Sequence, residues 1–143
     1  MRSAKILLVF ALVGPLFGLI VFALGIGTMA SIDGKPEGMW VSPLLILYGL
    51  FFAHFVGLPW ALIAGLCASI LAACTPRRGI WIGAAGGALS FATAAMFKAV
   101  PLPPPVSPEA PIDNTFTWTI AAVYLLVHVI SAAVSWLIAR RFA

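Results

Sequence analysis

The chain has 143 residues, of which 63% are hydrophobic and only 8% are charged, and its formal net charge is +4. A soluble domain carries roughly 25% charged residues, so these values exclude a water-soluble globular protein. The basic residues stand mostly in pairs beside apolar runs rather than in a patch, which indicates membrane orientation and contact with anionic lipid instead of nucleic-acid binding.

The first apolar run covers residues 6–30 and follows the basic residues Arg2 and Lys5. A signal peptide also begins with positive charge, but its apolar region is only about 7–15 residues long. The longer run is typical of an uncleaved transmembrane helix. Because proline lacks a backbone N–H, we expect Pro15 to kink this helix.

The second apolar run covers residues 43–74 and is too long for a straight span. As one helix it would measure about 48 Å, whereas the hydrocarbon core is about 30 Å thick. Tilt, an interfacial first segment or a kink would each absorb the excess. We favour a kink at Pro59, whose ring clashes with the carbonyl of Phe55.

Two further apolar runs complete the chain, over residues 80–97 and 116–139. The loop between them, residues 98–115, is rich in proline, which favours an extended and stiff connection. The four runs predict one all-α domain over residues 1–143, an integral membrane four-helix transmembrane bundle.

Charge alternates between the breaks that separate these runs. All four acidic residues lie in the breaks after the first and third runs, and basic pairs lie in the remaining break and at the two ends. Cytoplasmic loops carry the excess of Lys and Arg, so both termini are predicted to be cytoplasmic, in a bacterial inner membrane. The residues expected at the cytoplasmic lipid headgroups are Arg77, Arg78, Arg140 and Arg141.

The tryptophans agree with this topology. Trp40 and Trp118 fall at outer ends of the runs, and Trp81 and Trp136 fall at inner ends. Amphipathic indole rings concentrate at membrane interfaces, so we expect these four side chains to anchor the spans there.

Small residues recur every four positions in the second and third runs. This spacing lets helix backbones approach closely, which drives association where lipid offers no hydrophobic contrast. The sequence predicts close helix packing but leaves open whether it occurs within one chain or between chains. The residues expected to form it, a glycine zipper, are Gly49, Gly57, Ala61, Gly65, Gly79, Gly83 and Gly87.

Two histidines are the only titratable groups of interest within the runs. His128 lies near the midplane by count from either end, whereas the depth of His54 depends on which end of the long second run anchors it. One interpretation is a neutral histidine bonded to a neighbouring helix. The alternative is that both side chains ligate a b-type haem or bind a quinone.

No charged residue lies inside a predicted span, which disfavours proton- or ion-coupled transport. No nucleophile elbow, phosphate loop or cluster of metal ligands is found in the sequence, so we expect neither catalysis nor a metal site. The leading hypothesis is a non-catalytic accessory or assembly subunit in the lipid bilayer, a homo-oligomer or part of a larger membrane complex, with no required cofactor. The alternatives are a haem- or quinone-binding electron-transfer module and a small permease.

Overall fold

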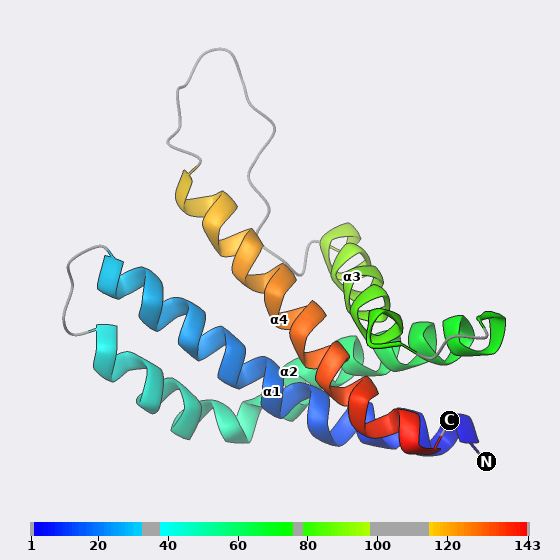
Figure 1. Ribbon diagram of the computed structural model, residues 1–143. Helices are drawn as coiled ribbons and strands as arrows, with labels where there is room; N and C mark the ends of the chain where they lie inside the picture. Colours follow the sequence, from blue (N-terminus) through cyan, green and yellow to red (C-terminus); the bar gives the residue numbers. More distant parts are fainter. Residues whose placement is uncertain (1, 33–37, 76–78, 98–114, 143) are drawn as a thin grey trace, which may run out of the picture.

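The computed structural model describes residues 2–32, 38–75, 79–97 and 115–142 (Figure 1). Arg77, Arg78 and residues 98–114 of the proline-rich loop lie outside them. The described chain is an all-α four-helix bundle, formed by α1 (Arg2–Ile32), α2 (Gly38–Cys74), α3 (Trp81–Met96), α4 (Thr115–Ala139) and a terminal 3-10 turn, η1 (Arg140–Phe142).

Three of these helices are long and apolar enough to cross a membrane. The stretches that qualify among the described residues are Ser3–Met29, Ala53–Cys74 and Trp118–Ala139. The third predicted span is shorter than expected, because α3 has only 16 residues and is therefore about 24 Å long. The protein is thus a multi-pass membrane protein with three long apolar helices and one shorter apolar helix.

The helices form a ring in which each packs against the two that precede and follow it. α1 contacts α2, α2 contacts α3, α3 contacts α4, and α4 returns to α1. Figure 1 shows both chain termini at the same end, together with the end of α2 and the start of α3. The polypeptide therefore passes up and down the bundle.

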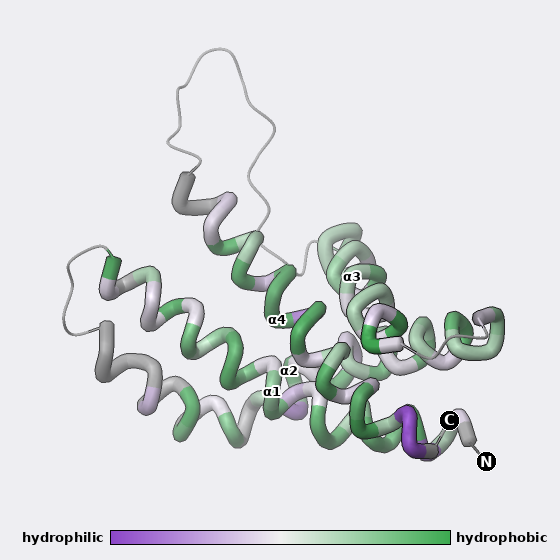
Figure 2. Tube along the Cα trace, in the orientation of Figure 1, coloured by the Kyte–Doolittle hydropathy of each residue, from purple (hydrophilic) through white to green (hydrophobic). Residues whose placement is uncertain are grey.

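Apolar residues predominate along all four helices (Figure 2), and many of the large ones are exposed. On α1, for example, Leu8, Leu12 and Leu24 are each more than half exposed. A soluble protein rarely leaves such a continuous apolar surface uncovered, so this surface is suited to contact with lipid chains.

The long second helix is not straight. α2 remains helical through Pro43 and Pro59, and Figure 1 shows that it changes direction between its cyan half and its green half. Pro59 lies in this middle part, where a bend was expected because the ring removes one backbone hydrogen bond. α1 also remains helical through Pro15, and a kink there stays a prediction.

The tightest packing lies toward the end of the bundle that holds both termini. Phe10, Ile82 and Trp136 are fully buried there, surrounded by small residues of α2 and α4. Trp136 also donates from its indole Nε1 to the carbonyl of Gly79, at 3.0 Å. Its ring was expected to anchor the span at the membrane interface, which stays a prediction; the structure shows the ring buried, where it joins α4 to the start of α3. Trp81 and Trp118 are 45% and 61% exposed.

The glycines of α3 bring three backbones together. A Cβ atom added at Gly86 would lie 2.7 Å from the carbonyl oxygen of Ala64 on α2. One added at Gly83 would lie 2.7 Å from the carbonyl oxygen of Ala132 on α4, and one added at Gly87 would clash with the backbone of His128. Real Cβ atoms do not approach so closely, so only glycine permits α3 to lie at this distance from both neighbours.

The small residues of α2 meet large side chains of α1. Gly49 faces Leu19, Gly57 faces Pro15, and Gly65 faces Phe10. Ala61 meets Gly14 of α1, whose added Cβ would lie 3.1 Å from that of Ala61. These contacts all lie within one chain. Gly79 differs from the others, because its nearest neighbour is the ring of Trp81, two residues away.

Substituting Gly86 with alanine should destabilise the bundle, because the new methyl group meets rigid backbone. We expect Gly86→Ala to lower the free energy of unfolding by about 1–3 kcal/mol, as overpacking does in other cores. Gly18→Ala is the matched control, since its Cβ would meet Val127 at an ordinary 3.4 Å. Unfolding by titration with a denaturing detergent measures both, and equal stability of the two variants would contradict the packing described.

Candidate functional site

A cavity of about 500 Å³ lies between the four helices, away from the packed end of the bundle. Its walls come from one face of each long helix, with α2 contributing Gly49, Ala53, Gly57 and Ala61, and the shorter α3 contributing Ser90 and Ala94. Glycine and alanine at these positions leave space that larger side chains would occupy. The small-residue face of α2 therefore has two roles. It lets α1 approach closely, and its lack of large side chains contributes to the cavity.

The cavity opens toward the lipid-facing surface beside α2. Val56 lines it and is nevertheless 70% exposed, so this side chain lies at its rim. At the opposite end the cavity reaches Phe10 and Ala132, which belong to the packed cluster around Trp136. The space is therefore closed toward the termini and accessible from the side.

Most of the wall is apolar, and aromatic rings form part of it. Phe22 and Tyr124 pack against each other across α1 and α4, with ring centroids 5.5 Å apart, and both line the cavity. Trp60 lines it from α2. An apolar space with a few polar groups at fixed places is the usual form of a small-molecule site, and its volume lies within the roughly 300–1,000 Å³ range of such sites.

Two serine hydroxyls on the wall are already committed as donors. Ser90 of α3 is fully buried and donates to the carbonyl of Trp60 on α2, at 2.8 Å. Ser131 donates to the carbonyl of Val127 on its own helix, at 2.5 Å. Each hydroxyl oxygen retains lone pairs, but Ser90 is fully buried, so only Ser131 presents an acceptor to an occupant.

His128 is a further polar residue of the wall, in addition to the phenol of Tyr124 and the indole of Trp60. Its Nδ1 lies 2.8 Å from the carbonyl of Tyr124, one helical turn earlier. A carbonyl oxygen only accepts, so this ring nitrogen carries a proton and donates it. The other nitrogen, Nε2, is buried and has no hydrogen-bond partner among the described residues. The ring also meets Phe91 edge to face, with centroids 5.7 Å apart.

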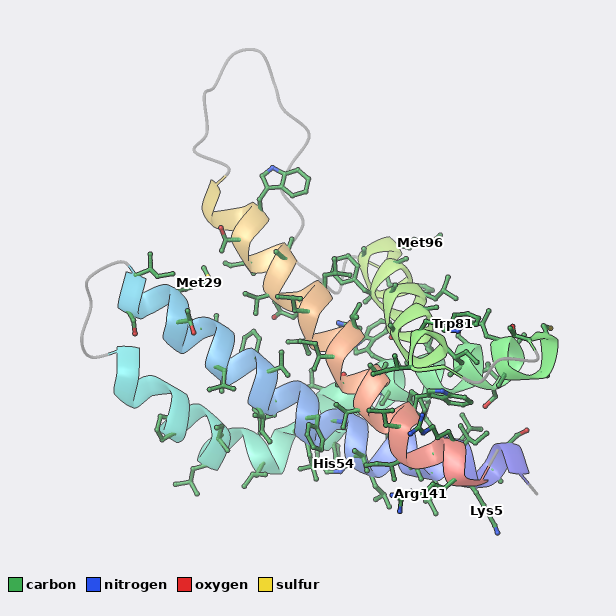
Figure 3. The ribbon with its side chains drawn as sticks, viewed as in Figure 1. Lys5, Met29, His54, Trp81, Met96 and Arg141 are labelled. Carbon is green, nitrogen blue, oxygen red and sulfur yellow. The ribbon has the colours of Figure 1, made fainter. Side chains whose placement is uncertain are left out.

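His54 lies at a similar level in the bundle but not on the cavity wall. On α1, Leu19 and Pro15 face Gly49 and Gly57, so His54 lies between these two levels. Gly18 of α1 faces Val127, the neighbour of His128. The contacts with α1 thus place both histidines beside the middle of that helix. Figure 3 labels His54 in the middle part of α2.

The structure brings one of the two predicted histidines to the cavity. His128 lines it, whereas the α2 residues that do so are the neighbours of His54, Ala53 and Gly57, and not His54 itself. Ligation of one haem by both side chains therefore finds no support in this arrangement. Within the described residues no group of three His, Cys, Asp or Glu side chains is placed to hold a metal ion.

The sequence reasoning missed Trp60, Ser90 and Tyr124 as parts of one site. The signal for Ser90 was its place four residues after Gly86 on the small-residue face of α3. Comparison with known proteins adds no further guide, since no protein-family model, no curated protein and no solved structure matches this chain.

The bond from Ser90 to Trp60 should stabilise the bundle, because it joins two helices beside the cavity. We expect Ser90→Ala to lower the free energy of unfolding by about 0.6–1.7 kcal/mol, the range found for hydrogen bonds between membrane helices. Thr93→Val is the matched control, since Thr93 donates to Leu89 within α3. If both variants lose the same stability in detergent titrations, the bond between the helices has no special role.

Proposed function

We propose that this protein binds a lipid-soluble molecule within the membrane, in the cavity between its four helices. The observation that carries the proposal is the cavity itself, an apolar space of about 500 Å³ in a bundle that is tightly packed elsewhere. The side chains around an apolar space of this size gain dispersion contacts when an apolar molecule fills it, which favours binding. The opening beside Val56 faces lipid, from which such a molecule would enter.

The same proposal includes the predicted topology, with four crossings of a bacterial inner membrane and both termini in the cytoplasm. Figure 3 shows Lys5 and Arg141 at one end of the bundle and Met29 at the far end of α1. Arg140 and Arg141 are exposed at the same end. A cluster of basic side chains favours the cytoplasmic face, where the anionic lipid headgroups are.

We also propose that the protein acts without catalysis. The hydroxyls of Ser90 and Ser131 donate to backbone carbonyls, so neither is held by a base that would activate it as a nucleophile. The proton of His128 Nδ1 is committed to the carbonyl of Tyr124 in the same way. These groups are arranged to hold an occupant rather than to transform it.

Of the other hypotheses, the permease has the weaker support. A permease needs a polar path across the bundle, whereas this cavity is mostly apolar and ends at the packed cluster of Phe10 and Trp136. A role as accessory or assembly subunit stays a prediction. The small-residue faces that motivated it are occupied by contacts within the chain, so they do not by themselves indicate a partner.

Filling the cavity should displace the bound molecule. We expect Ala53→Leu to lose most of the lipid-soluble material that copurifies with the wild-type protein, because Ala53 lies on the cavity wall. Ala92→Leu adds the same volume to an exposed position of α3 and should retain it. Extraction of the purified proteins with organic solvent, followed by mass spectrometry, measures the amount per chain. Equal amounts in both variants would place the bound material outside the cavity.

The topology predicts that a reporter active only in the cytoplasm works when fused after Ala143, and that one active only outside works when inserted near Pro108. The excess of basic residues beside the termini is the reason. Activity of the external reporter at the C-terminus would overturn this orientation.

A further inference from the structure

The chemical class of the occupant can be inferred from the hydrogen-bonding groups of the cavity wall, and this inference rests on the proposed function. Because Nδ1 of His128 donates to Tyr124, the neutral ring leaves Nε2 with a lone pair and no proton. No Asp or Glu lies in any of the four helices, so none of the helices offers a carboxylate to balance a charged imidazolium at this depth. Nε2 is therefore a buried acceptor without a donor among the described residues.

An acceptor left unpaired in an apolar setting costs free energy, on the order of 1–3 kcal/mol. An occupant that supplies a hydroxyl or another donor recovers this energy, whereas one that offers only acceptors does not. Ser131 adds an acceptor, because it has given its proton to a backbone carbonyl. The phenol of Tyr124 and the indole N–H of Trp60 on the same wall are donors, so an occupant that both donates and accepts fits this wall.

The shape and lining of the cavity narrow the class further. Phe22, Trp60 and Tyr124 contribute rings to the wall, and stacked or edge-on contacts with an aromatic occupant add to simple burial. The opening beside Val56 gives an apolar tail a way out into the lipid. A flat aromatic head with a hydroxyl group and a long tail matches each of these features.

We propose that the cavity binds a membrane hydroquinone, with a ring hydroxyl donating to Nε2 of His128, in preference to the corresponding quinone. The oxidised ring has two carbonyl oxygens, which only accept, and it cannot bond to this nitrogen. In the empty bundle Nε2 is covered by protein, and Phe91 packs beside the ring. A ring hydroxyl therefore reaches Nε2 when Phe91 moves aside. The hydrogen bond to Nε2 offsets the free-energy cost of this movement, and an occupant without a donor cannot form that bond.

Binding of matched probes to the purified protein in lipid nanodiscs tests this proposal. The probes are a benzohydroquinone with a ten-carbon tail, kept under anaerobic conditions, and its quinone, and quenching of tryptophan fluorescence or calorimetry gives each Kd. We expect the hydroquinone to bind the wild-type protein about tenfold more tightly, the equivalent of one hydrogen bond of about 1.4 kcal/mol.

Variants locate the effect at one nitrogen. His128→Phe keeps a ring but removes the acceptor, so the two affinities should become equal while the quinone still binds. His128→Gln retains an acceptor and should keep part of the preference, which guards against a variant that fails only in folding. His54→Phe is the matched control and should behave as the wild type, because His54 is not on the wall.

The outcomes separate the two proposals. If neither probe binds the wild-type protein and Ala53→Leu copurifies with as much lipid-soluble material as the wild type, the cavity is not a ligand site and both proposals fail. If both probes bind the wild-type protein equally and Ala53→Leu weakens both, the ligand site stands and the selection for a hydroxyl fails. If the preference survives in His128→Phe, another group provides it and the assignment to Nε2 is overturned.

Discussion

The close approach of α3 to its two neighbours is the constraint on which the remaining structure depends. In a bilayer there is no hydrophobic force between helices, so dispersion contacts and hydrogen bonds must hold them together. Gly83, Gly86 and Gly87 remove the side chains that would separate α3 from the backbones of α2 and α4. The bond from Trp136 to Gly79 then fixes the start of α3. Together these contacts close the end of the bundle that holds both termini.

The cavity follows from the same choice of residues. α3 ends after 16 residues, so it covers less of the bundle than the long helices do. Beyond the packed cluster, α2 continues with Gly49, Ala53 and Gly57, which line the cavity together with Leu19 and Pro15 of α1. Small residues thus have two consequences. Where another helix lies against them, the bundle packs tightly, and where it does not fill the space beside them, the cavity remains. His128 lies at the hollow part with one nitrogen paired and the other not.

Much of the helical architecture was predictable from the sequence, because long apolar runs leave few alternatives in a membrane. The first and fourth runs differ from α1 and α4 by a few residues at the ends, and the second begins five residues late. The buried position of Trp136 was not predictable. Charge and aromatic placement indicate how deep a residue lies, whereas burial depends on which face meets another helix, and these helices carry apolar residues on buried and exposed sides alike.

The candidate site was predictable only in part, for a related reason. The sequence singled out His54 and His128, and contacts with α1 place both at a similar level. Depth alone did not reveal that one lies on the cavity wall and the other does not, since that depends on the rotation of α2 against α1. The bend of α2 around its middle part makes this rotation impossible to extrapolate from either end of the helix.

The most direct test of the account is a crystal structure grown from a lipid mesophase under xenon pressure, since xenon enters apolar cavities that water leaves empty. The account predicts xenon, or a lipid-soluble molecule that excludes it, beside Trp60 and His128, and neither of them between Phe10 and Trp136. A bundle in which α1, α2 and α4 have closed over this space, or in which ordered water runs through it to the packed end, would contradict the account.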